Sequence, residues 1–186
     1  NVTVTNPSVD ELEFHAADLI LGQHLSGYNA DINIANSPSP WARMMLGASN
    51  LTGLHITDAE FDRITTTGTL TLGGDDTDSV YIDGLTFDGG VLYTHISAMN
   101  TLMSNITFLG GYTSFAQSTT LQAMNHISTS AHIFVDGEVI LRADSDCNKS
   151  GECIITDTCS FNRNNRHLNL TSHDIHIKGE TNGCRD

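Results

Sequence analysis

Length, composition and charge limit what this chain can do. It has 186 residues, with eight Lys and Arg against 22 Asp and Glu, which gives a formal net charge of −14. The few cations are scattered, whereas a protein that binds nucleic acid or an anionic membrane surface needs clustered cations, so the composition argues against both partners. No apolar run approaches the roughly 20 residues that a membrane-spanning helix needs.

The start of the chain, NVTVTNPSVDELEF, does not have the features of a signal peptide. It has neither a basic start nor an apolar core, and no initiator Met precedes it. We therefore expect a mature product or a piece of a longer precursor. The length suits one well-buried domain.

Alternation of apolar and polar residues predicts short strands along the whole chain. Near the start, residues 12–22 alternate, although Ser8 and Glu11 resemble a capping box and leave a capping helix over residues 9–25 as the alternative. The stretch 62–90 is rich in Thr, Gly and β-branched residues, which favour strands and corners over helix. We predict further strands at 30–36, 131–143, 152–161 and 166–179, another coil with irregular corners at 42–57, and a loop at 144–151.

A period of 21 residues runs through the middle of the chain. Rows offset by 21 place Ile64, Leu85, Ile106 and Ile127 in one column, and they align IDGLTFDGG at 82–90 with MSNITFLGG at 103–111. Four more columns share apolar, hydroxyl or small residues: Thr65, Thr86, Thr107 and Ser128; Phe61, Ile82, Met103 and Met124; Leu70, Val91, Tyr112 and Ile133; Gly68, Gly89, Gly110 and Ala131. Such a period is typical of a β-solenoid, in which like residues stack about 4.8 Å apart.

The predicted fold class is all-β, a single-stranded right-handed parallel β-helix with about 21 residues per coil and a disulfide-bonded C-terminal segment. Residues 1–143 form the β-solenoid, with the clearest repeats at 59–135. Residues 144–186 form Cys-rich C-terminal coils or a cap of the same domain. An antiparallel sandwich would also alternate, but it does not require like residues at a spacing of 21, so the columns favour the solenoid.

One segment resembles a known family. Residues 54–87, LHITDAEFDRITTTGTLTLGGDDTDSVYIDGLTF, contain TDAEFDRI, then TTGTLTLGG, then a short strand of Val and Ile. This order resembles the repeats of filamentous-haemagglutinin-like exoproteins, the large secreted β-helical adhesins of bacteria. The resemblance implies a right-handed parallel β-helix that serves adhesion or surface architecture and has no catalytic centre. The Cys-rich tail and the short chain depart from that family, whose members are usually long and poor in cysteine.

Cysteine usage points to an oxidising compartment. The four cysteines all lie near the C-terminus, at Cys147, Cys153, Cys159 and Cys184. An even number in a short polar tail predicts two disulfides, with three possible pairings, and a protein that is secreted or at the cell surface. A zinc site is the alternative, but the spacing lacks the close pairs of the usual zinc ligands.

Five Asn-x-Ser/Thr sequons predict covalent N-glycans if a eukaryotic cell secretes the protein. They lie at Asn1, Asn50, Asn105, Asn148 and Asn169. In the predicted strand around 106, Ile106 faces inward. The side chains of Asn105 and Thr107 are therefore expected to point outward.

No residue pattern points to catalysis or to a cofactor. Asp75, Asp76 and Asp78 lie beside turn glycines, where Asp commonly serves the turn itself. Asp144 and Asp146 alternate like the first half of a calcium loop, but the later ligands are missing, so they are only weak metal candidates. The histidines are isolated or lie on opposite strand faces. We predict no enzyme activity, no cofactor and no metal site.

The ends of a solenoid suggest a function, because they leave unpaired backbone N–H and C=O groups. Val2 and Val4 alternate in a strand that can pair with the edge of a neighbouring copy, and head-to-tail contacts of this kind generate filaments. The sequence thus predicts an extracellular structural or adhesive subunit that self-associates end to end into a homopolymeric filament or fibril. The alternative is a carbohydrate-binding or polysaccharide-degrading β-helix protein that acts on surface carbohydrate.

Overall fold

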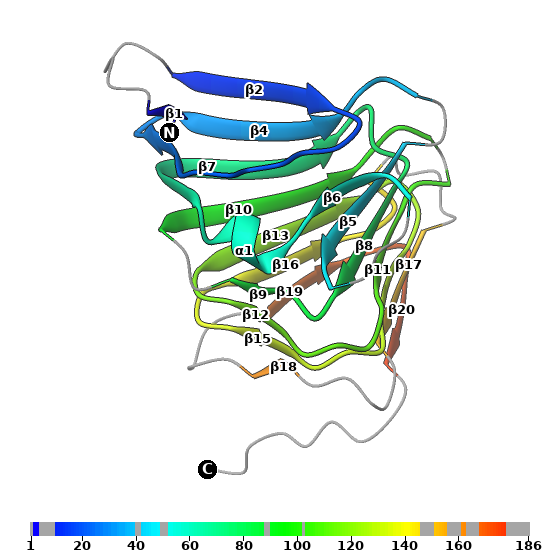
Figure 1. The fold of residues 1–186 in the computed structure, drawn as a ribbon. Coiled ribbons are helices and arrows are strands. Elements are labelled where there is room, and N and C mark those ends of the chain that lie inside the picture. Colours follow the sequence, from blue (N-terminus) through cyan, green and yellow to red (C-terminus); the bar gives the residue numbers. More distant parts are fainter. Residues whose placement is uncertain are drawn as a thin grey trace.

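The structure is a computed structural model that describes residues 2–3, 10–39, 42–48, 52–87, 90–101, 103–145, 151–155, 161–162 and 168–177. Within these ranges nearly all regular structure is β-strand, and every strand pairing is parallel (Figure 1). The strands form three sheets, which we call sheets A, B and C. The prediction of an all-β protein with parallel strands is therefore confirmed.

Each sheet is built from strands that lie far apart in the sequence. Sheet A contains β1 (Val2–Thr3), β2 (Glu11–Ala16), β3 (Leu25–Tyr28), β4 (Asp31–Asn36), β7 (Ile64–Gly74), β10 (Val91–Ala98), β13 (Ser118–Ala123), β16 (Val139–Arg142) and β19 (Leu168–Thr171). Sheet B has the order β6 (Leu54–Ile56), β5 (Arg43–Gly47), β8 (Ser79–Asp83), β11 (Asn105–Phe108), β14 (Ile127–Thr129), β17 (Glu152–Ile155) and β20 (Asp174–Ile177). Sheet C has the order β9 (Thr86–Phe87), β12 (Thr113–Phe115), β15 (Ile133–Val135) and β18 (Phe161–Asn162).

From β7 onwards the chain visits the sheets in the fixed order A, B, C. The strands β7, β8 and β9 make one coil, and β10 to β12, β13 to β15 and β16 to β18 make the next three. Before β7, the strands β1 and β2 share one row of sheet A, and β3 and β4 share the next, because the long β7 pairs with both β3 and β4. Sheet A therefore has seven rows, which end at β19.

Two columns of inward-facing side chains in sheet A run through all seven rows. One column consists of Leu12, Ile32, Leu70, Thr94, Thr119, Val139 and Leu168, and the other of Phe14, Ile34, Leu72, Ile96, Leu121, Leu141 and Leu170. The members from β4 to β16 are almost fully buried, whereas those in the first and last rows are half-buried. Because buried apolar surface stabilises by about 25 cal/mol per Å², these columns hold neighbouring rows together.

A short helix, α1 (Asp58–Phe61), covers the first strand of sheet C. The Asp58 carboxylate accepts a hydrogen bond from the Thr86 backbone N–H of β9 at 3.2 Å. The Phe61 ring meets the Phe87 ring edge to face, with centroids 5.0 Å apart. Helix α1 thus satisfies and covers the edge of sheet C at β9.

The structure decides between the strand and the capping helix that the sequence left open near the N-terminus. Residues 11–16 form β2, so the strand is confirmed and the capping helix is wrong over these residues. The capping-box pattern that does begin a helix is the one from Thr57 to Glu60. There the Glu60 carboxylate accepts a hydrogen bond from the Thr57 backbone N–H at 2.9 Å.

The predicted fixed period of 21 residues is wrong, although like residues do stack. Ile106 lies opposite Ile127 as predicted, but on its other side it lies opposite Val80, a step of 26 residues. Ile64 pairs with Leu25 in sheet A, far from the predicted column. Elsewhere the step is 20 residues from Thr119 to Val139 and 29 from Val139 to Leu168. The corners vary in length, so stacked residues are not separated by a constant number of residues, although the strands still align within each sheet.

The likeness between the segments 82–90 and 103–111 also has a different cause from the one predicted. Thr86 and Phe87 lie in β9 of sheet C, whereas Thr107 and Phe108 lie in β11 of sheet B. Phe108 in fact lies opposite Ile82 of β8. The two copies are therefore alike in sequence but lie in different sheets.

In the predicted column of Thr65, Thr86, Thr107 and Ser128, the residues Thr107 and Ser128 do lie opposite each other. Their hydroxyl oxygens are 3.3 Å apart, on the outer face of sheet B. In the same strand Ile106 is buried, while Asn105 and Thr107 are half-buried on the other face. The expected outward direction of these two side chains is confirmed.

Replacement of Phe87 by Ala should lower the free energy of unfolding by about 3–5 kcal/mol, because it leaves a cavity beside the Phe61 ring. Phe134, which is half-buried in β15 of the same sheet, is the matched control. Its replacement by Ala should cost less than half as much. Urea unfolding followed by circular dichroism measures both, and equal losses would show that Phe87 carries no special share of the core.

Candidate functional site

The N-terminal end of the stack is formed by the edge strand β2. In the described part of the chain, β2 pairs with β4 alone, so its other edge offers free backbone N–H and C=O groups (Figure 1). Its inward side chains Leu12 and Phe14 pack against the core but stay half-buried, whereas Ile32 and Ile34 in the next row are fully buried. The apolar core therefore reaches the surface at this end.

The segment 17–24 leads from β2 back to β3 and is tied to the region of α1. The backbone N–H of Leu21 donates to the Glu60 carboxylate at 3.2 Å, and the Arg63 guanidinium donates to the Leu21 carbonyl. The preceding residue, Ile20, is 83% exposed. Leu19 and Leu21 of this segment pack against the core, whereas Ile20 is exposed to solvent.

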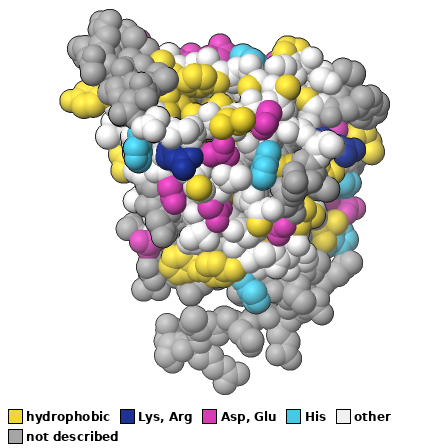
Figure 2. All heavy atoms as spheres, in the orientation of Figure 1, with side chains coloured by type: hydrophobic (Ala, Val, Ile, Leu, Met, Phe, Trp, Pro, Cys, Tyr) yellow, Lys and Arg dark blue, Asp and Glu magenta, His cyan; other side chains and the backbone are white. Residues whose placement is uncertain are grey.

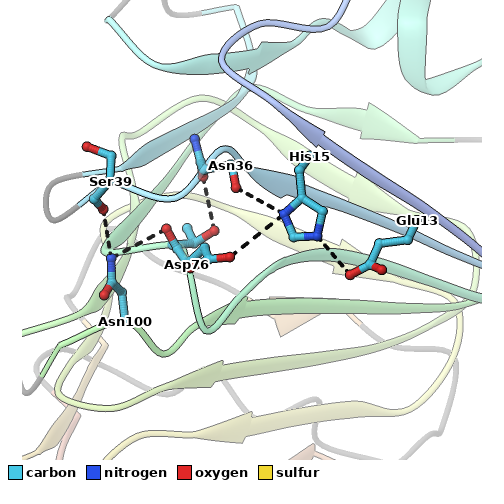
Figure 3. A network of polar contacts seen from close by, with 7 residues as sticks. Glu13, His15, Asn36, Ser39, Asp76 and Asn100 are labelled. Atoms are coloured by element: carbon cyan, nitrogen blue, oxygen red, sulfur yellow. Dashed lines mark hydrogen bonds and ion pairs between the residues drawn. The ribbon is translucent and has the colours of Figure 1, made fainter.

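A polar network joins β2 to the corner between sheets A and B (Figure 3). The His15 Nε2 lies 2.8 Å from a Glu13 carboxylate oxygen. Its Nδ1 lies 3.4 Å from the Asn36 carbonyl and 3.7 Å from an Asp76 carboxylate oxygen. Both ring nitrogens thus face acceptors only, and only the doubly protonated imidazolium can donate to both. The Glu13 hydrogen bond, and after it the Asn36 carbonyl, raise the pKa of His15 above 6.5.

The same corner is held by amide side chains that bond to the backbone. Asn36 donates to the Arg43 carbonyl at 2.7 Å and accepts from the Thr77 hydroxyl at 3.0 Å. Asn100, two rows further on after β10, donates to the Ser39 carbonyl at 3.0 Å (Figure 3). These bonds fix the corners of successive coils to one another. A cavity of about 380 Å³ opens beside them, lined mainly by small and polar residues.

A groove of about 420 Å³ lies on the outer face of sheet A. Tyr93, His95, Thr120, Glu138 and Arg142 line it from three successive rows. Burial lowers the pKa of His95, and the positive charge of Arg142 acts in the same direction. The His95 Nε2 is buried and has no hydrogen-bond partner among the described residues. The groove thus combines a neutral imidazole, hydroxyls, an ion of each sign and an exposed aromatic ring.

The structure describes two of the five predicted glycan acceptors. Asn105 lies in β11, and its side-chain oxygen accepts the His126 backbone N–H at 3.0 Å. Asn169 lies exposed in β19. Asn1, Asn50 and Asn148 lie outside the described residues.

The predicted disulfides stay a prediction. Cys153 is buried in β17, and no disulfide is shown in the part of the chain that the structure describes. Cys147, Cys159 and Cys184 lie outside that part.

The weak metal candidates are only partly described. Asp144 has a left-handed φ of 56°, and its backbone N–H donates to the Asn125 carbonyl at 3.1 Å, so it shapes a turn. Asp146 lies outside the described residues. Of the acidic run near 76, Asp78 accepts from the hydroxyls of Ser79 and Thr101 and is nearly buried, which fits the predicted role in the turn.

The His15 network was not predicted from the sequence. His15 and Asp76 lie in β2 and after β7, two rows apart, and only the varying length of the coils brings them together. The sequence did contain a signal for one contact of this network. The alternation in β2 places Glu13 and His15 on the same outward face.

Comparison with known protein families, with curated proteins and with solved structures finds no match to this chain. The resemblance to filamentous-haemagglutinin-like exoproteins therefore stays a prediction. Among the described residues, no helix has the length and apolar character needed to cross a membrane.

His15 should titrate above pH 6.5 in the folded protein. Since folding raises its pKa, the stabilisation from this network is fully present below the pKa of the unfolded chain and is lost as the pH rises through the folded pKa. Glu13→Gln should move the pKa back towards 6.5. Histidine NMR titration measures both values, and Glu11→Gln, on the same strand face, is the control that should leave His15 unchanged. An unchanged His15 pKa in Glu13→Gln would show that the hydrogen bond to Glu13 does not raise it.

Proposed function

We propose that this chain is a secreted, N-glycosylated structural or adhesive protein, folded as a single right-handed parallel β-helix that assembles end to end into a filament. The fixed order A, B, C in successive coils supports the helix, and crossovers between parallel strands are right-handed in almost all proteins. The outward position of Asn105 and Asn169 suits glycans that project from the sheet faces.

The observation that carries the proposal is the match between the two ends of sheet A. The two inward columns begin with Leu12 and Phe14 in β2 and end with Leu168 and Leu170 in β19, and all four side chains are half-buried. If β2 of one copy pairs with β19 of another, the columns continue across the junction without a break. Each half-exposed apolar side chain then gains the neighbour that every other row already has.

The outward side chains of the same strands are compatible with this pairing. Glu13 would lie opposite Asn169, and His15 opposite Thr171, so that no like charges face each other across the junction. Because the surfaces of the two ends differ, the contact is head to tail and does not close, and it therefore generates a filament.

On the face shown in Figure 2, acidic and histidine side chains lie scattered among uncharged ones, and Lys and Arg are few.

The assembly test uses two variants that each block one end, Phe14→Lys in β2 and Leu170→Lys in β19. At high protein concentration the unchanged protein should form rods with a repeat of about 34 Å, from seven rows at about 4.8 Å. Each variant alone should remain a monomer, because a buried ammonium group is costly at the junction. Electron microscopy and analytical ultracentrifugation give the two readouts.

Mixing the two variants provides the decisive control. Each keeps the end that the other lacks, so an equimolar mixture should form one-to-one dimers that do not grow. Leu92→Lys, which adds the same charge at a 46% exposed site in β10, should assemble like the unchanged protein. A protein that stays monomeric at all concentrations, or a mixture that behaves like its separate components, would refute end-to-end assembly.

The groove on sheet A favours a second candidate function, carbohydrate binding. Tyr93 exposes 56% of its surface beside the hydroxyls and charges of Thr120, Glu138 and Arg142. An aromatic face flanked by hydrogen-bonding groups suits a sugar ring.

A glycan array tests this second candidate with a matched pair of tyrosines. Tyr93→Ala should weaken binding about fivefold, since an aromatic contact of this kind contributes about 1 kcal/mol. Tyr112→Ala removes a ring that is equally exposed, at 56%, but lies outside the groove, and it should bind like the unchanged protein. Absence of binding to any glycan, or equal losses in both variants, would remove this candidate.

A further inference from the structure

Three potential metal ligands meet on the outer face of sheet B, near its C-terminal edge. Glu152 lies in β17, and Asp174 and His176 lie in β20. The register places Glu152 directly opposite Asp174, and His176 two residues further along β20 on the same face. One carboxylate oxygen of each acid and one ring nitrogen of His176 all lie within 4.8 Å of one another.

The surroundings hold this arrangement in place. The backbone N–H of Glu152 donates to the His126 Nδ1 at 3.0 Å, which anchors the start of β17 to the preceding coil. Glu152 is half-buried, while Asp174 and His176 are exposed, so the three groups are accessible from solvent. The site is therefore built on two paired strands and open to one side.

Electrostatics alone does not explain why the two acids lie opposite each other. Like charges at directly opposed positions of neighbouring strands destabilise a sheet. The chain also carries a formal net charge of −14, which adds to the repulsion. A bound cation would attract both carboxylates and so offset the repulsion between Glu152 and Asp174. The imidazole of His176 lies where it would complete a set of three donors.

We infer that Glu152, Asp174 and His176 bind one divalent transition-metal ion, with Zn²⁺ as the best-fitting member of the class. Calcium and magnesium take oxygen ligands, whereas Zn²⁺ combines imidazole nitrogen with carboxylate oxygen. Three protein ligands leave a position that water or another donor fills. The ion links β17 to β20 and so fastens the last described coil to the rest of the stack.

The sequence hides this site because its members belong to different strands. Glu152 and Asp174 are 22 residues apart, and comparison of His173 with His176 along one strand finds only opposite faces. The predicted candidate Asp144 lies at the same corner, where a Cβ on Gly151, the residue before Glu152, would collide with it. It is not one of the three converging ligands.

Calorimetric titration of the full chain with Zn²⁺ tests the site. The unchanged protein should bind one equivalent, and His176→Asn and Glu152→Gln should each weaken binding at least tenfold. Two exposed positions elsewhere provide matched controls, His24→Asn and Glu138→Gln, which should bind like the unchanged protein. Ca²⁺ should bind more weakly than Zn²⁺. Equal Zn²⁺ affinity in all variants, or tighter binding of Ca²⁺, would overturn the inference.

Two further readouts separate the site from the cysteines and from a purely structural role. With Co²⁺ as the probe, the absorption spectrum should show ligand-field bands without thiolate charge transfer, and a thiolate band would assign the metal to the cysteines instead. Glu152→Gln should raise the melting temperature of the metal-free protein, because it removes the repulsion with Asp174, and should abolish the further rise that Zn²⁺ gives the unchanged protein. A fall in the metal-free melting temperature, with the Zn²⁺ response intact, would contradict the assignment.

Discussion

The structure depends on the stacking of inward-facing side chains from one coil on those of the next. A single coil cannot bury its apolar face, and each row gains a dry environment only from the rows on either side of it. This requirement acts on positions within strands and not on distances along the chain. It explains why Ile106 lies between Val80 and Ile127 although the two steps differ by five residues. The columns tolerate Thr94 and Thr119 because small hydroxyl residues still fit between apolar neighbours.

Corners absorb the differences in coil length, and they do so with polar side chains. At the corner between sheets A and B, Asn36 and Asn100 donate hydrogen bonds to the backbone carbonyls of Arg43 and Ser39 in neighbouring segments. Where two corners approach closely, a side chain is excluded: a Cβ on Gly111 would collide with the backbone of Gly84. Corners can therefore change in length without disturbing the sheets, and they carry the groups that distinguish one coil from another.

At the ends of the stack, inward-facing side chains have a neighbouring row on one side only. In sheet B the first strand, β6, is fully buried at Leu54 and Ile56, whereas β2 in sheet A leaves Leu12 and Phe14 half-buried. Of these two terminal strands, it is β2 in sheet A that leaves inward apolar side chains incompletely buried, which would give a strand-to-strand contact a defined direction. The net charge of −14 opposes association between copies, but salt screens such repulsion over about 8 Å at physiological ionic strength. In the proposed assembly, short-range apolar contact would then hold two ends together.

Alternation and composition determined the class of this protein and most of its strands. Alternating residues and Thr-rich strands predicted an all-β protein, and columns of like residues predicted parallel stacking. Alternation correctly placed β4, β11 and the outward side of Asn105. The register was beyond the sequence, because a period assumes corners of equal length, and here Leu85 falls in a corner instead of a column. Only the tertiary structure brought His15 to Asp76 and Glu152 to Asp174, since those contacts form between rows whose alignment is set by side-chain packing across the core.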